Sequence, residues 1–121
     1  MNFSQSVKSV YSRYVLFSGR AGRPEYWYFA LFSFIVQIAI AIVSIASENA
    51  SNILMAIFIL GSLLPSIGVG VRRLHDTDRS GWWMLFGIIP LIGTIVLIVF
   101  FCLRGTEGPN RFGEGPMPPV A

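Results

Sequence analysis

Three long runs without a charged residue, separated by short polar segments, most constrain what this chain can fold into. They cover Tyr26–Ala46, Ile53–Val71 and Trp82–Leu103, and each is long enough to cross the hydrocarbon core of a bilayer as a helix. Charged residues make up only 12% of the 121 residues, about half the proportion typical of a soluble domain. A soluble chain this short cannot bury that much apolar surface, so the sequence predicts an integral membrane protein.

The runs predict an all-α integral membrane fold, a small bundle of three transmembrane helices over residues 26–46, 53–71 and 82–103. At 1.5 Å per residue the last run would be about 33 Å long, which is enough for one crossing and not for two. The turn Ser47–Asn52 is short, so the first two spans should form an antiparallel hairpin. We expect one membrane domain over residues 1–115 and a disordered tail over residues 116–121.

The segment before the first span, Met1–Ser18, predicts an amphipathic helix that lies in the membrane interface. Aromatic and aliphatic side chains recur at helical spacing on one face, and polar side chains fill the other. Packing of this helix against other helices of the protein is the alternative. The apolar face consists of Phe3, Val7, Val10, Tyr11, Tyr14 and Phe17.

The distribution of basic residues predicts the orientation in the membrane. Four basic residues precede the first span and three lie between the second and third, whereas the turn Ser47–Asn52 holds none and the tail holds two. This asymmetry places the N-terminus and the loop between the second and third spans in the cytoplasm. Three spans would put the tail outside, but if the last run re-enters instead of crossing, the tail is inside.

A dense cluster of charge, Arg72–Arg79, separates the second and third runs and includes the only histidine of the chain. Arginine forks match phosphate oxygens, and a nearby carboxylate can orient them. Together with Arg20–Glu25 this cluster predicts a cytoplasmic cap that binds an anionic headgroup, a small phosphorylated ligand or a partner. The alternative is that the arginines only fix the topology and pair with carboxylates. The candidate cap residues are Arg20, Arg23, Glu25, Arg72, Arg73, His75, Asp76, Asp78 and Arg79.

Aromatic residues at the starts of the first and third runs predict anchors at the membrane–water boundary. Tyr26 and Trp27 open the first run, and Trp82 and Trp83 open the third. Both pairs should lie on the same side of the membrane as the charged cap.

The sequence offers little for catalysis or for a cofactor. His75 and Asp76 are adjacent, and adjacent residues on a helix do not face each other. One histidine, one cysteine and scattered carboxylates lack the convergent spacing of a metal site. The few basic residues lie beside the spans, not along a solvated face that could bind nucleic acid. We therefore expect no catalytic residue, no metal, no cofactor and no nucleic-acid partner.

Three separated blocks of sequence resemble one family. They are Phe17–Trp27 (FSGRAGRPEYW), Arg72–Trp82 (RRLHDTDRSGW) and Asn110–Gly113 (NRFG). In these blocks the chain resembles the small bacterial inner-membrane proteins of domain-of-unknown-function family 805. The resemblance implies a compact multi-span protein of the bacterial inner membrane, and it implies no activity, substrate or cofactor.

We expect a structural or accessory membrane component whose cap contacts anionic lipid or a partner protein, with a homo-oligomer as a further expectation. A subunit of a transporter or channel is one alternative, although no span carries a charge at mid-membrane and only Gln37 is strongly polar inside a span. A membrane-embedded enzyme acting on lipid phosphates is another, supported only by the arginine, histidine and aspartate residues of the cap.

Overall fold

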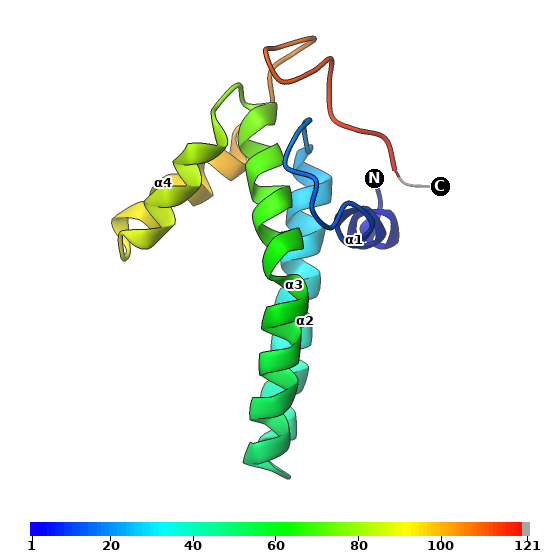
Figure 1. Cartoon of the computed structure of the whole chain (residues 1–121), viewed down its shortest axis with the longest axis vertical. Helices are drawn as coiled ribbons and strands as arrows, with labels where there is room; N and C mark the ends of the chain where they lie inside the picture. The colour runs from blue at the N-terminus through cyan, green and yellow to red at the C-terminus, as the bar shows by residue number, and fades with distance from the viewer. Residues whose placement is uncertain (120–121) are drawn as a thin grey trace.

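The computed structural model describes residues 1–119, and its named elements are all helical (Figure 1). In chain order they are α1 (Phe3–Ser12), α2 (Arg23–Val43), α3 (Glu48–Asp76), the 3₁₀-helix η1 (Gly81–Ile88) and α4 (Ile92–Cys102). α2 and α3 form a long antiparallel stem, α1 lies across it, and η1 with α4 form a shorter hairpin that leaves the stem at the end of α3. The all-α prediction is confirmed.

Local sequence signals fix both ends of the stem helices. Pro24 and Glu25 occupy the first turn of α2, where a proline lacks no needed donor and a carboxylate meets the positive end of the helix dipole. The side chain of Ser47 caps α3 by accepting a hydrogen bond from the Ala50 amide. Both helices are long and apolar enough to cross a membrane.

The run Trp82–Leu103 does not form one continuous helix, so the prediction of a third spanning helix over residues 82–103 is not confirmed. It divides into η1, with 8 residues, and α4, with 11 residues. Each is about 16 Å long, roughly half the thickness of a hydrocarbon core. The chain then returns to the end of α3, where the Thr106 amide donates to the Asp76 carbonyl at 2.7 Å. The run therefore folds back on itself as a hairpin, which we call the short hairpin, Gly81–Cys102.

The turn of the short hairpin has a physical cause in its sequence. Pro90 lacks an amide proton and ends the helical hydrogen-bonding pattern. Leu91 has φ 62° and ψ −64°, and the Ile92 amide donates to the Pro90 carbonyl at 2.7 Å, which closes a γ-turn. Gly93 lies against the backbone carbonyl of Phe86, so the two arms approach closely where a side chain would not fit.

The N-terminal helix forms, but it covers Phe3–Ser12 and packs on the stem. Asn2 and Gln5 make a reciprocal capping box at its start. Val10 is fully buried with Phe29 and Val69, and the Tyr11 hydroxyl lies 2.7 Å from the Ser62 hydroxyl. Part of the surface of α1 therefore packs against α2 and α3, as the alternative interpretation of the sequence expected. Its place at the membrane interface stays a prediction.

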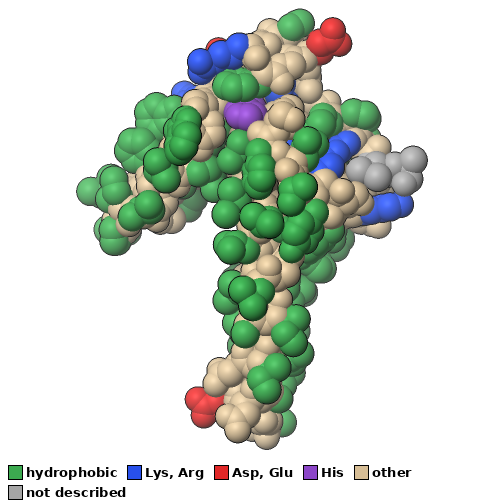
Figure 2. All heavy atoms as spheres, viewed as in Figure 1, with side chains coloured by type: hydrophobic (Ala, Val, Ile, Leu, Met, Phe, Trp, Pro, Cys, Tyr) green, Lys and Arg blue, Asp and Glu red, His purple; other side chains and the backbone are tan. Residues whose placement is uncertain are grey.

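Polar and apolar residues divide along the length of the molecule (Figure 2). Side chains of Lys and Arg gather at the end where α3 meets the short hairpin and the N-terminal segment, while the stem below is covered by hydrophobic side chains. Glu48 begins α3 at the opposite end. The fold thus places the candidate cap at one end of an apolar stem.

The last described residues pack on the same end of the molecule. The Met117 amide donates to the Arg20 carbonyl at 3.1 Å, and the Arg13 side chain donates to the Pro118 carbonyl. Residues 120 and 121 lie outside the described part of the chain. A single membrane domain over residues 1–115 and a disordered tail over 116–121 stay predictions.

Candidate functional site

The centre of the candidate site is Asp76, a buried carboxylate held between two buried arginines. Asp76 ends α3 and is 3% exposed. Its Oδ1 accepts from Arg20 Nε at 3.0 Å, and its Oδ2 accepts from Arg73 Nη1 at 2.7 Å. Arg73 lies three residues earlier on the same helix, whereas Arg20 comes from the segment before α2. One carboxylate therefore ties the N-terminal segment to the end of α3.

A second buried pair joins α2 to α3 beside the first. Arg72 Nη1 donates to both oxygens of Glu25, at 2.8 and 3.1 Å. The Ser9 hydroxyl adds a third bond to Glu25 at 3.1 Å, and Arg13 lies 3.6 Å from it. Nε and Nη2 of Arg72 have no hydrogen-bond partner among the described residues. Among the described residues, Glu25 is the only carboxylate that forms an ion pair with Arg72.

The same arginines hold the segment that follows α4. Arg20 donates to the carbonyls of Thr106, Gly108 and Gly113, at 2.6, 2.7 and 3.2 Å. Arg73 donates to the carbonyls of Phe101 and Leu103. Because guanidinium groups carry several donors in a fixed plane, each arginine joins a carboxylate and several carbonyls at once. We call the group Arg20, Glu25, Arg72, Arg73 and Asp76 the ion-pair latch.

His75 belongs to the same region and bonds to the loops on either side of it. Its Nδ1 lies 2.9 Å from the Gly19 carbonyl, and its ring stacks on Phe112 with centroids 4.0 Å apart. His75 lies beyond the apolar stretch that ends at Val71. Burial lowers the pKa of the imidazole from its ordinary value, the bond to Gly19 opposes this, and Arg111 lowers the pKa further. The ring therefore acts as a packing and hydrogen-bonding group between Gly19 and Phe112.

Besides His75, three other predicted cap residues lie outside the latch. Arg23 is exposed at the first position of α2. Asp78 pairs with Arg111 at 3.2 Å, with both side chains about half exposed or more. Arg79 lies over the Phe100 ring at 4.2 Å. The structure thus divides the predicted cap into a buried set and an accessible set, a division that the sequence did not predict.

Three of the four predicted anchors contact residues of the short hairpin, and the fourth is largely exposed. The Trp27 indole donates to the Phe101 carbonyl at 3.1 Å, and Tyr26 packs on the Phe101 ring with centroids 4.3 Å apart. Trp83 stacks on Phe86, whereas Trp82 is 77% exposed. Tyr26 and Trp27 therefore hold the short hairpin to the stem, whereas most of the Trp82 surface is free of such packing; anchoring of the four residues at the membrane boundary stays a prediction.

Sequence reasoning missed several members of the site. Ser9 is not among the predicted cap residues, yet it is fully buried and bonds to Glu25. Asn110 donates to the His75 carbonyl at 2.9 Å, and Gly105 lies against the Asp76 carboxylate, where a side chain would clash. The NRFG block was a signal for Asn110 and Phe112, but nothing in the sequence indicated their partners.

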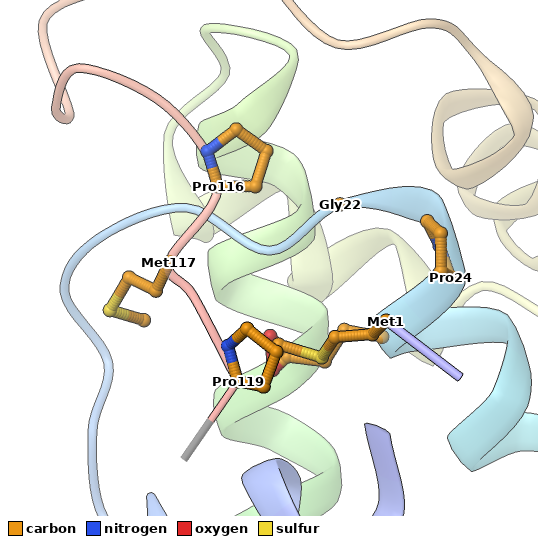
Figure 3. Close-up of a pocket in the computed structure, with 7 residues that line it drawn as sticks. Met1, Gly22, Pro24, Pro116, Met117 and Pro119 are labelled. Carbon is orange, nitrogen blue, oxygen red and sulfur yellow. The ribbon is translucent and has the colours of Figure 1, made fainter. Parts of the chain in front are cut away.

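Two cavities lie beside the latch. One, of about 270 Å³, lies between the N-terminal methionine and the last described prolines, with Glu25 in its wall (Figure 3). The other, of about 300 Å³, has two exposed arginines, Arg23 and Arg104, in its wall together with Asp76 and Glu107. The first is mostly apolar in lining residues, and the second has charges of both signs. Among residues 1–119, no three histidine, cysteine or acidic side chains are grouped to hold a metal ion.

A helical stem long enough to cross a bilayer, closed at one end by a buried ion-pair latch, defines a small helical membrane protein. The chain belongs to the DUF805 family, described as proteins of unknown function, whose model matches residues 14–114. It is 46% identical to inner membrane protein YhaI of Escherichia coli strain K12 over 108 residues, 89% of this chain and 92% of that one. It is 44% identical to inner membrane protein YhaH of the same strain over 111 residues, 88% of this chain and 92% of the relative. The resemblance seen in the sequence is confirmed.

A more distant relative is the uncharacterized protein YiiR of Escherichia coli strain K12, 32% identical over 124 aligned positions, 81% of this chain and 84% of that one. No solved structure matches the chain at a significant level. All three blocks that carry the resemblance fall inside the family match, and the residues of the latch all lie in the first two of them. The family match thus covers the whole latch.

Proposed function

We propose that the chain is a structural or accessory protein of the bacterial inner membrane, without catalytic activity. Its stem crosses the bilayer twice, and the latch holds a compact cytoplasmic cap that meets anionic headgroups. The observation that carries this proposal is the separation of charge from apolar surface along the molecule (Figure 2). The names of YhaI and YhaH as inner membrane proteins support the location.

The re-entrant course of the short hairpin strengthens the argument for orientation. All nine basic residues either precede Tyr26 or follow Val71. With two crossings instead of three, both groups lie on the same side, and the turn at the far end of the stem carries none. An excess of basic residues marks the cytoplasmic side. The N-terminus, the cap and the segment after α4 are therefore assigned to the cytoplasm, with α1 at headgroup level.

Cysteine labelling in intact cells tests this topology. In a Cys102→Ser background, Asn49→Cys should react with a membrane-impermeant thiol reagent added outside, because the turn between α2 and α3 is periplasmic. Glu114→Cys should react only after the cells are permeabilised. Labelling of both variants in intact cells would require a third crossing, and labelling of Glu114→Cys alone would invert the orientation.

The lipid contact rests on Arg23, the exposed basic residue at the start of α2. It borders a hollow of about 320 Å³ together with Pro24, Trp27 and Tyr28. Amphipathic aromatic side chains favour the headgroup boundary, so a guanidinium beside them lies at the depth of lipid phosphates. The buried arginines of the latch are already paired, and the exposed Arg104 pairs with Glu107 at 3.0 Å, so Arg23 is the exposed arginine that we assign to the headgroup contact.

Replacing Arg23 should therefore weaken the preference for anionic lipid. One basic residue near an anionic surface contributes about 1 kcal/mol, so we expect Arg23→Gln to lower the retention of phosphatidylglycerol about fivefold. Native mass spectrometry of protein released from mixed-lipid nanodiscs measures the retained lipid. Arg111→Gln is the matched control, since it removes the same charge from the loop that pairs with Asp78. Equal retention by the parent and both variants would contradict a lipid site at Arg23.

A further inference from the structure

A groove between α2 and α3 in the apolar part of the stem has an unusually polar lining. It encloses about 230 Å³. Four of its seven lining residues carry a hydroxyl or an amide. The lining consists of Ser33, Gln37, Phe58, Ile59, Ser62, Leu63 and Ser66. We call it the stem groove.

Gln37 gives this groove an energetic problem in a membrane. It lies 12 residues after Glu25, about 18 Å along α2, and 6 residues, about 9 Å, before the end of α2 at Val43, and therefore within the apolar part of the stem. Its side chain is exposed, and no hydrogen bond joins its amide to another described residue. An amide without a partner is strongly disfavoured in hydrocarbon, where no water can replace the missing bonds.

The fold itself indicates what shape of partner fits the groove. Tyr26 and Gln37 are about three helical turns apart and share one face of α2. At the cap end of that face, Tyr26 packs on Phe101 of α4, and Gly70 of α3 lies against Met84 of η1. The short hairpin thus lies on the cap end of this face, while the stem groove holds no residue of the hairpin in its lining and is touched by α1, whose Tyr11 hydroxyl lies 2.7 Å from the Ser62 hydroxyl. Helices of this chain therefore already pack on this face of the stem.

We propose that the stem groove is the contact surface for a second copy of this chain. Two copies inserted with the same topology are related by an axis along the membrane normal, which places their two Gln37 side chains at the same depth. A glutamine amide has both donors and acceptors, so two of them satisfy each other reciprocally. The serines that line the groove with Gln37, Ser33 on α2 and Ser62 and Ser66 on α3, are small enough to let the two stems approach closely.

Cross-linking in lipid vesicles tests the geometry of this contact. In a Cys102→Ser background, Gln37→Cys should form a disulfide-linked dimer under mild oxidation. Ile35→Cys is the matched control, because Ile35 is 50% exposed at a similar depth but lies about 200° round the same helix. Equal cross-linking at both positions, or at Ile35 alone, would overturn the proposal.

The energetic part is tested by Gln37→Leu, which removes the amide and leaves an apolar side chain suited to the bilayer. Single-molecule photobleaching in vesicles of decreasing protein-to-lipid ratio measures the dimer dissociation constant. We expect that constant to rise about three- to thirtyfold, the range for one or two interhelical hydrogen bonds. Gln37→Asn should weaken the dimer less. The proposal would be overturned if the parent protein stays monomeric at every ratio. It would also be overturned if a lipid or another protein occupies the groove.

Discussion

Replacing Asp76 by asparagine should destabilise the protein by about 3–5 kcal/mol, because the change leaves two buried guanidinium groups without their shared counter-charge. Arg20 and Arg73 are both at most 1% exposed, and both bond to this carboxylate. Asparagine keeps the size of the side chain, so the loss reports on charge. Thermal or denaturant unfolding in detergent micelles measures the free energy of unfolding.

Asp78→Asn provides the matched control two residues away. Asp78 also pairs with an arginine, Arg111 at 3.2 Å, but both side chains are accessible to solvent. Exposed ion pairs contribute roughly 0–1 kcal/mol. Asp78 has φ 59°, and asparagine adopts that left-handed backbone region as readily as aspartate. If the two variants unfold alike, the latch contributes no more than a surface pair and the account of a buried cluster fails.

The latch also shows where sequence reasoning about the site reached its limit. The sequence identified every charged member, because the blocks around Arg20 and Arg72 are the densest charge in the chain. It could not indicate which charges are buried, since Arg20 and Asp76 are 56 residues apart and meet only in the folded chain. The interpretation of the arginines as residues that pair with carboxylates fits Arg20, Arg72 and Arg73. Arg23 is exposed and is the residue to which we assign the lipid contact.

The stem was predictable for a different reason. Residues 26–46 and 53–71 are uninterrupted apolar runs with ordinary signals at their ends, such as Pro24 before one and Ser47 before the next. The third run has the same hydropathy and length, yet it folds back on itself. Length and composition alone do not distinguish one spanning helix from two half-length helices. The distinguishing features are Pro90 and Gly93, whose effect depends on contacts between the two arms.

Adding a single methyl group at Gly93 should therefore lower the stability of the protein strongly. A β-carbon added there would coincide with the backbone carbonyl oxygen of Phe86, which cannot move away as a flexible side chain could. Gly93→Ala should therefore push the arms of the short hairpin apart. Overpacking of this kind costs about 3 kcal/mol, at the upper end of its usual range because backbone must move. Trp83 and Phe86, stacked at 4.9 Å, lie in the arm that is displaced.

Gly61→Ala is the matched control, because it lies within α3 and a β-carbon there meets nothing within 4 Å. Replacing that glycine should change stability by less than about 1 kcal/mol, in the favourable direction expected of alanine in a helix. Hydrogen–deuterium exchange separates the two variants by location. Gly93→Ala should raise exchange across residues 81–102 while the stem stays protected, whereas Gly61→Ala should leave both unchanged. Equal protection of residues 81–102 in the two variants would mean that the arms do not touch at Gly93, and the run Trp82–Leu103 would again be open to a full crossing.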